Sequence, residues 1–288
     1  MYPWTERNGR ISWLKLPFFV LTLAPGAWIA AQAELDWLGP KPVTEAIHQN
    51  GDWIIHFLLL TLAVTPLRFV GRWPKLINVR RMLGVAAGCY ALIHVALYVV
   101  DQKFDMATVA SEIALRFYLT IGFVAVAALV ALLVTSTDAM ISKLGSSKWN
   151  RLHALIYPAT LLGLVHFFIQ SKLNVFEPLL MTGVFFLLMS YRGLRKWKLP
   201  TGFVALMILA LVSAAVTGAG EVLWYWLTRG IDPIRVLMSQ FDFSYQIRPA
   251  WWTLAIALVL PLVALIRGQA PPRSVRPAAK PAREPAEA

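Results

Sequence analysis

The chain has 288 residues, of which 58% are hydrophobic and only 15% are charged, with a formal net charge of +12. A soluble domain usually carries about 25% charged residues, so this composition excludes an ordinary soluble enzyme. Apolar runs of about 17–25 residues recur along the chain, and each is long enough to cross about 30 Å of hydrocarbon. The sequence therefore predicts an all-α, polytopic transmembrane helical bundle.

Eight candidate spans follow one another along the chain, at approximately 12–33, 50–68, 82–100, 115–134, 153–170, 175–191, 202–227 and 250–267. The triplet AQA at the end of the first span is a weak match to a signal-peptidase site, so a cleaved signal peptide is a minor alternative there. The loops are too short to bury a core of their own. The last segment, QAPPRSVRPAAKPAREPAEA, is rich in proline, alanine and charge, and residues 269–288 are predicted to be a disordered cytoplasmic tail.

The positive charge is distributed as membrane topology requires. The N-terminus, the segments 68–81, 135–152 and 192–200, and the C-terminal tail together hold 20 of the 27 lysines and arginines, whereas the alternate loops hold seven. Basic flanks on the same side of an even number of spans place both termini in the cytoplasm. The net charge of +12 is therefore not a nucleic-acid footprint.

The single cysteine, Cys89, lies inside a hydrophobic segment. One cysteine excludes an intramolecular disulfide, a CxxC redox pair and the CxxCH attachment of a c-type haem. We expect Cys89 to be a buried, inert thiol.

Ionisable groups inside the spans are the informative residues, because each one costs free energy unless it is paired or used. They are His56, His94, His153, His166, Glu221 and, near an edge, Asp52. Carboxylates at depth are almost absent, which disfavours a proton pump or a cation-coupled transporter. Histidines without carboxylates indicate neutral imidazole ligands, which suit iron, copper and zinc.

Two of these histidines are predicted to lie at the same depth. His94 follows Arg81 by 13 residues and His166 follows Arg151 by 15, and both spans run outward from the cytoplasm. At 1.5 Å per residue the two imidazoles lie roughly 20 and 22 Å into the membrane. Imidazoles at matching depth on different helices can occupy the opposite faces of one haem iron.

The remaining polar candidates admit more than one interpretation. His153 lies about 20 Å below His166 in depth, with Pro158 between them, so it indicates a second, separate site near the cytoplasmic face. Each histidine alone also fits a hydrogen bond to a neighbouring helix, and for His56 this structural role is as plausible as a functional one. We expect His48 to lie solvated in the loop before its span, with an axial or quinone-facing role as the alternative, and Glu221 to snorkel or pair with another helix.

The sequence resembles the MsrQ family, also called YedZ, within the ferric-reductase-like transmembrane superfamily. The matching stretches are LLLTLAVTPLR (58–68), VRRMLGVAAGCYALIHVALY (79–98), RFYLTIGFVAVAALVALLVTST (116–137), DAMISKLGSSKWNRLHALIYP (138–158) and LVHFF (164–168). Together they cover about residues 10–198.

The resemblance implies a six-helix bundle that holds b-type haem, over residues 1–200. His94 and His166 match one pair of axial ligands, and His153 matches a third histidine associated with haem, so one haem is expected and a second is an alternative. Relatives with two stacked haems carry another histidine about 14 positions before His94, where this chain has Arg80. Family members are also described as using FMN, for whose phosphate Arg80 and Arg81 are weak candidates.

Residues 201–268 add two spans that the six-helix pattern lacks. Packing against the bundle or against a partner is the simplest interpretation of these spans. The connecting loop, TRGIDPIRVLMSQFDFSYQIRP, is predicted to face the periplasm, where docking of the reductase is the alternative role.

The resemblance implies a subunit of the bacterial inner membrane that passes electrons through haem. The donor would be the quinone pool or a cytosolic flavin reductase. The acceptor would be a periplasmic, molybdopterin-dependent methionine sulfoxide reductase subunit that repairs oxidised proteins. Two alternatives are another cytochrome b of the superfamily, such as a ferric-chelate reductase, and a histidine-lined metal permease that binds no haem.

Overall fold

The structure is a computed structural model that describes residues 2–6, 8–172 and 174–268. These residues form α-helices and one short 3-10 helix, and their only β pairing is an isolated bridge between Thr5 and Ile11. The all-α class is therefore confirmed. The tail predicted at 269–288 lies outside the described residues.

A helix occupies each of the eight predicted spans. These helices are α1 (Lys15–Glu34), α2 (Pro42–Val70), α3 (Ile77–Asp101), α5 (Phe117–Val134), α7 (Ile156–Ser171), α8 (Phe176–Lys196), α9 (Phe203–Arg229) and α11 (Pro249–Arg267). The sequence analysis did not predict the shorter elements between them, which are η1 (Pro74–Leu76), α4 (Met106–Leu115), α6 (Asp138–His153) and α10 (Pro233–Ser239).

Seven stretches of the described chain are long and apolar enough to cross a membrane, and one of them combines α6 with α7. Helix α8 is not among these stretches, although its 21 residues extend about 31 Å. It carries Glu177 in its first turn and Arg195 and Lys196 in its last turn, and much of its length is buried. The sixth predicted span is therefore an amphipathic helix packed inside the bundle.

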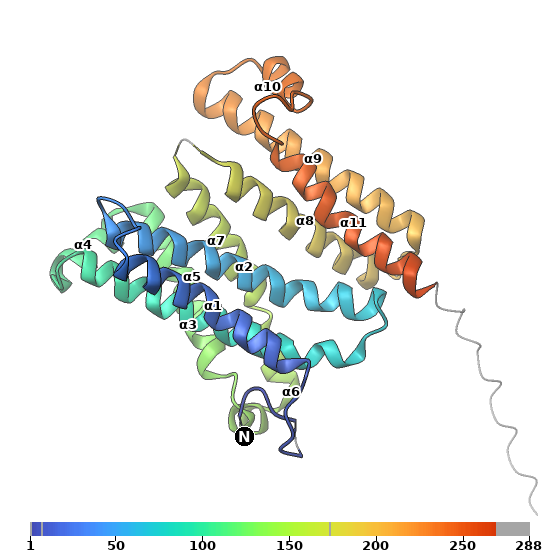
Figure 1. Cartoon of the computed structure of the whole chain (residues 1–288), viewed down its shortest axis with the longest axis horizontal. Helices are drawn as coiled ribbons and strands as arrows, with labels where there is room; N and C mark the ends of the chain where they lie inside the picture. The colour runs from blue at the N-terminus through green and yellow to red at the C-terminus, as the bar shows by residue number, and fades with distance from the viewer. Residues whose placement is uncertain (1, 7, 173, 269–288) are drawn as a thin grey trace, which may run out of the picture.

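Helix α2 is the central helix of the bundle and contacts α1, α3, α7, α8 and α11. Its side chains Phe57, Leu58 and Leu62 are almost fully buried and form one cluster with apolar residues of α3, α5, α7 and α8. In Figure 1, α1, α2, α3 and α5 lie on one side of α8. We call residues 15–196 the core bundle.

Helices α9 and α11, with the short helix α10 between them, cover the other side of α8 (Figure 1). We call residues 203–267 the C-terminal hairpin. Leu206 and Ala210 of α9 and Ala257 of α11 are buried against Leu187 and Tyr191 of α8. The two added spans thus pack on the bundle through a cluster of apolar residues of their own.

The helix is interrupted between His153 and Ile156. The sequence had predicted one continuous span from residue 153. Helix α6 ends at His153, and α7 begins at Ile156. Pro158 lies in the first turn of α7, a position that tolerates proline because the first backbone N–H groups of a helix have no intrahelical acceptor. Pro158 therefore belongs to a helix start and does not kink the span between the two histidines.

Cys89 is exposed in the structure, so the prediction of a buried thiol was wrong. Its neighbours Gly88 and Tyr90 are buried, which places Cys89 on the opposite face of α3, away from the core. The hydrophobicity of a membrane helix does not distinguish the face that packs on protein from the face that meets lipid.

Candidate cofactor site

A cavity of about 550 Å³ opens between α2, α3, α5 and α7, at the end of the bundle where α2 begins and α3 ends. Its inner wall is apolar and includes Ile55, Leu58 and Leu129. Its rim is polar and consists mainly of His48, Asp52, Tyr98, Asp101, Glu112, Arg116, Tyr118, Gln170, Asn174 and Glu177.

His94 of α3 and His166 of α7 face each other across this cavity. Their ring centroids are 6.5 Å apart, and the ring planes cross at 86°. The structure therefore brings together the two histidines that the depth estimate placed at one level.

The orientation of His166 is set by α5. Its Nδ1 atom lies 2.8 Å from the carbonyl oxygen of Tyr118. Because a carbonyl oxygen only accepts, Nδ1 carries the proton and donates it, which leaves Nε2 with its lone pair. This is the protonation state that an imidazole needs in order to bind a metal.

Gly122 makes this hydrogen bond sterically feasible. A Cβ atom at residue 122 would lie 2.9 Å from Nδ1 of His166 and 3.0 Å from its Cε1. Such distances are too short for any side chain, so only glycine lets the imidazole lie against α5 at this level.

His94 has a similar environment on α2. A Cβ atom at Gly51 would lie 3.2 Å from Cε1 of His94, so the ring lies close against the α2 backbone. The buried Nδ1 atom of His94 makes no hydrogen bond within the described residues. A buried, unpaired imidazole nitrogen is costly unless a ligand uses the ring.

The dimensions of this site fit a haem. Two metal–imidazole bonds of about 2.0 Å each, together with the distance from each nitrogen to its ring centre, add up to about 6 Å. The observed centroid separation is 6.5 Å. The cavity lies within the ~300–1,000 Å³ range of cofactor pockets, and its apolar inner wall matches a planar apolar ring.

The rim of the cavity is more acidic than basic. The rim contains one arginine, Arg116. The guanidinium of Arg116 pairs with Glu112 and donates to the Tyr118 hydroxyl at 3.2 Å. That hydrogen bond raises the pKa of Arg116. Asp52, Asp101 and Glu177 complete the set of charged groups around the opening.

His153 lies at the opposite end of α5. Its Nε2 atom is 3.2 Å from the Thr135 hydroxyl, and its ring stacks on Trp149 at 3.7 Å between centroids. Tyr118 and Thr135 are 17 residues apart on α5, which corresponds to about 25 Å along the helix. The structure thus separates His153 from the His94–His166 pair, in agreement with the predicted difference in depth.

Arg80 and Arg81, the weak candidates for a flavin phosphate, lie near the start of α3, and their charges act on His153. Arg81 is also ion-paired with Asp138 at 2.6 Å. The two arginines therefore belong to the end of the bundle that holds His153.

The structure corrects or refines the other polar candidates. His48 lies within α2 and lines the cavity rim, because α2 begins eight residues earlier than predicted; its exposure is as predicted, but its placement in a loop was wrong. His56 bonds the carbonyl of Asp52 in its own helix at 2.7 Å and packs on Trp53, which fits the structural interpretation.

Glu221 is paired rather than snorkelling. Its carboxylate is 2% exposed and accepts hydrogen bonds from Gln240 at 2.9 Å and from Arg248 at 3.3 Å. The partners come from the segment between α10 and α11, so this network holds the loop of the C-terminal hairpin against α9.

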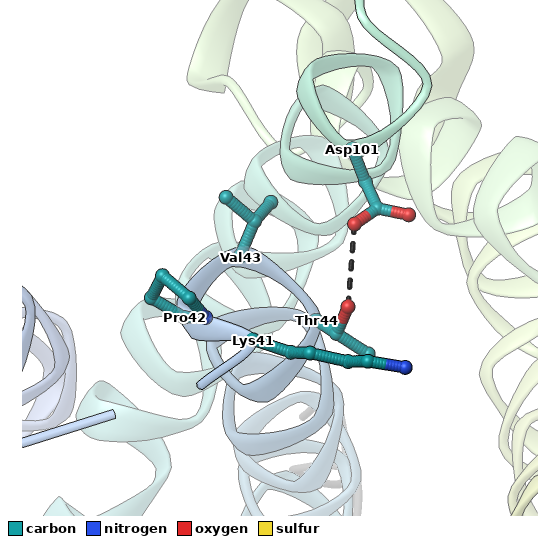
Figure 2. A pocket seen from close by; sticks show the side chains of 5 residues that line it. All are labelled: Lys41, Pro42, Val43, Thr44 and Asp101. Carbon is teal, nitrogen blue, oxygen red and sulfur yellow. Dashed lines mark hydrogen bonds between the residues drawn. The ribbon is translucent and has the colours of Figure 1, made fainter. Parts of the chain in front are cut away.

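A second hollow lies beside the cavity, between the start of α2 and the end of α3 (Figure 2). Lys41, Pro42, Val43, Thr44 and Asp101 line its volume of about 420 Å³, and the Thr44 hydroxyl lies 3.3 Å from the Asp101 carboxylate. It holds no imidazole and no redox-active side chain, so it adds nothing to the chemistry of the histidine pair.

Gly51, Gly122 and the Tyr118 carbonyl were not predicted as parts of the site. A glycine inside a helix costs about 1 kcal/mol relative to alanine. A glycine within a predicted span is therefore a sign, readable from the sequence, that another group packs against the helix there. The role of the Tyr118 carbonyl has no signal in the sequence, because every residue carries a backbone carbonyl.

Comparisons with known proteins show which proteins the chain resembles. Residues 51–164 match the family model described as "Ferric reductase like transmembrane component". No solved structure matches the chain.

Several curated proteins called "Protein-methionine-sulfoxide reductase heme-binding subunit MsrQ" are similar in sequence. The protein of Rhodospirillum rubrum is 37% identical over 188 residues, which cover 65% of this chain and 88% of the relative. The protein of Polaromonas naphthalenivorans is 38% identical over 197 residues, covering 66% and 90%. That of Xanthomonas oryzae pv. oryzae is 40% identical over 170 residues, covering 59% and 78%.

Proposed function

Because the chain belongs to the MsrQ family, we propose that it is the haem-binding, electron-transfer subunit of a membrane-bound methionine sulfoxide reductase system. The observation that carries the proposal is the pair of imidazoles that face each other at 6.5 Å in a cavity of the core bundle. The chain itself makes and breaks no bond of the substrate.

In this proposal, His94 and His166 would hold one b-type haem through its iron. The haem supplies reversible one-electron chemistry at its iron. The protein fixes the tautomer of His166 through the Tyr118 carbonyl, and the apolar wall of Ile55, Leu58 and Leu129 excludes water from the ring. The fixed orientation of the imidazoles and the apolar wall would set the reduction potential of the bound group.

The direction of electron flow follows from the proposed topology. In this topology the cavity end of the bundle faces the periplasm and both termini lie in the cytoplasm of a bacterial inner membrane, which the distribution of lysine and arginine supports. Electrons would enter from the quinone pool or from a cytosolic flavin reductase. They would leave the haem to a periplasmic, molybdopterin-dependent methionine sulfoxide reductase subunit, because the cavity opens on that side.

The end of the bundle that holds His153 is a weaker candidate for a second cofactor. Its cations Arg80 and Arg81 suit the phosphate of FMN, and the family resemblance is the ground for proposing this flavin. The ring of His153 is already engaged by Trp149 and Thr135. We therefore propose one haem per chain, at the His94–His166 pair.

The test is an absorption spectrum of the purified full-length protein. Reduction with dithionite should produce the sharp α and Soret bands of six-coordinate b-type haem, and a pyridine haemochrome assay should give one haem per chain. His94→Ala and His166→Ala should each remove most of this absorption, because each leaves the iron with one protein ligand.

His56→Ala is the matched control, because His56 lies in α2 outside the cavity; it should keep the full spectrum. Retention of full haem by both ligand variants would refute the assignment of the ligands. A colourless wild-type protein that binds exchangeable metal would instead favour the histidine-lined permease. Reconstitution with each donor in turn distinguishes the quinol from the flavin reductase.

A further inference from the structure

Two helices of the core bundle each carry a glycine where a histidine ring lies against their backbone. Gly51 and Gly122 both lie beyond the first turn of their helices, α2 and α5. By intrinsic propensity alone, alanine favours such an interior helical position over glycine. The contacts of the two glycines therefore need an explanation beyond helix formation.

Gly122 fixes the plane of the His166 ring. Three atoms of that ring would lie within 3.3 Å of a Cβ atom at residue 122, so the ring lies against the α5 backbone along its Nδ1 edge. The hydrogen bond from Nδ1 to the Tyr118 carbonyl, at 2.8 Å, then removes the freedom to rotate about the Cβ–Cγ bond. Contact and hydrogen bond together allow one orientation.

Gly51 acts on the His94 ring from the other wall of the cavity. A Cβ atom there would lie 3.2 Å from Cε1 and 3.5 Å from Nδ1 of His94. The two rings thus rest on two different helices, α2 and α5, and their planes cross at 86°.

Crossed rings have a specific electronic consequence for an iron held between them. An imidazole donates π-electron density into the iron d orbital that is perpendicular to the ring plane. Two parallel rings raise one such orbital above its partner, whereas two crossed rings act equally on both. Near-degenerate orbitals leave orbital angular momentum in the ferric state, which makes the g tensor of low-spin iron strongly anisotropic.

We propose that Gly51 and Gly122 are positioning residues that hold the His94 and His166 rings crossed and so determine the electronic state of the ferric haem. This inference rests on the proposed function, since it presumes that the two histidines are the axial ligands. It goes further by assigning a role to residues that touch neither iron nor substrate, and by predicting a spectroscopic signature.

The first test is low-temperature electron paramagnetic resonance of the oxidised wild-type protein. Crossed rings should give a low-spin signal dominated by one large g value, with the other two features broad and weak. A low-spin signal with three well-resolved g values, typical of parallel rings, would overturn the proposal while leaving the haem and its ligands in place.

The second test uses Gly122→Ala and Gly51→Ala. The methyl group at residue 122 would force the His166 ring away from α5 and break its hydrogen bond to Tyr118. The expected result is a lower maximal g value, or a high-spin signal where the ligand is lost. Gly51→Ala should produce a smaller shift in the same direction, because its nearest contacts are longer.

Gly84→Ala is the matched control. Gly84 lies in α3 but does not line the cavity, and a Cβ atom there would meet only Cγ2 of Thr61, at 3.8 Å. Its signal should equal that of the wild type. Unchanged signals in both Gly51→Ala and Gly122→Ala, with full haem, would refute the positioning role. If Gly122→Ala binds no haem, the wild-type signal and Gly51→Ala decide the question.

The failure of this inference is distinguishable from the failure of the proposed function. Wild-type protein without haem, or full haem in both histidine variants, contradicts the function. Haem with well-resolved g values contradicts only the crossed geometry.

Discussion

The core bundle and the C-terminal hairpin place polar groups inside apolar helices in opposite ways. In the core bundle, His94 and His166 face an open cavity, and the buried Nδ1 of His94 lacks a good hydrogen-bond partner. In the hairpin, the carboxylate of Glu221 is closed in by Gln240 and Arg248. The two regions thus differ in how their polar groups are satisfied: the carboxylate of the hairpin finds its partners within the protein, whereas the two imidazoles line an open cavity and one of their buried nitrogens is unpaired.

Glycine also serves different purposes in the two regions. Gly122 makes room for an imidazole at the edge of the cavity. Gly183 of α8 makes room for the hydroxyl groups of Thr217 and Thr253, which also contact each other at 3.3 Å. The first glycine shapes a site, and the second lets helices α8, α9 and α11 approach closely, as small residues do in membrane bundles.

The largest effect on stability is expected from Glu221→Ala. It leaves the guanidinium of Arg248 and the amide of Gln240 without their acceptor, and breaking a buried ion pair costs about 3–5 kcal/mol. Because Arg248 is a quarter exposed, we expect roughly 2–4 kcal/mol. The measurement is the free energy of unfolding in detergent.

Glu221 lies in the C-terminal hairpin, whereas the histidine pair lies in the core bundle. We therefore expect Glu221→Ala to leave the haem spectrum unchanged at room temperature. The double variant Glu221→Leu with Arg248→Met should recover much of the loss, since an apolar pair leaves no charge unpaired. A loss of haem in Glu221→Ala would show that the two regions are not independent.

Gly183→Ala should have the next largest effect. The added methyl group meets the Thr217 and Thr253 hydroxyls, and overpacking of this kind costs about 1–3 kcal/mol. Gly220→Ala is the control, because its nearest neighbour would be Leu179 at 3.6 Å. Thermal unfolding followed by circular dichroism should separate the two variants; equal midpoints would mean that the three helices repack at no cost.

His153→Ala sharpens the distinction between ligand and structural histidine. Loss of the stacking on Trp149 and of the Thr135 contact should cost about 1 kcal/mol, without change in the haem content of one per chain. The pyridine haemochrome assay measures that content. A fall to half of a wild-type value of two would place a second haem at this end of the bundle.

Arg229→Gln should have the smallest effect. Arg229, at the end of α9, donates to the carbonyl of Lys172 at 3.0 Å and so links the hairpin to the chain that follows α7. The bond is exposed, and we expect a loss of about 0.5 kcal/mol. Hydrogen exchange of the amides around residues 170–176 should become faster, while the absorption spectrum stays the same. Unchanged exchange would show that the rim of the cavity needs no support from the hairpin.

Much of the fold could be predicted from the sequence, because hydrophobic runs and basic flanks are local signals. A helix occupies every predicted span, and the matched depth of His94 and His166 follows from counting residues along two helices. The boundaries were less accurate at His48 and His153. Helix α2 begins before its apolar part, at Pro42, and the helix is interrupted before Pro158 instead of kinking at it. Both outcomes depend on the contacts between neighbouring helices.

The sequence by itself determined which segments are apolar helices and at what level each imidazole lies along its helix. Only the tertiary structure decided which way each ring faces, because the contacts that orient it come from other helices. His166 donates its hydrogen bond to a residue 48 positions earlier, and Glu221 pairs with Arg248, 27 positions later. Such partners are set by the packing of helix faces in three dimensions, which neither hydropathy nor helical periodicity records.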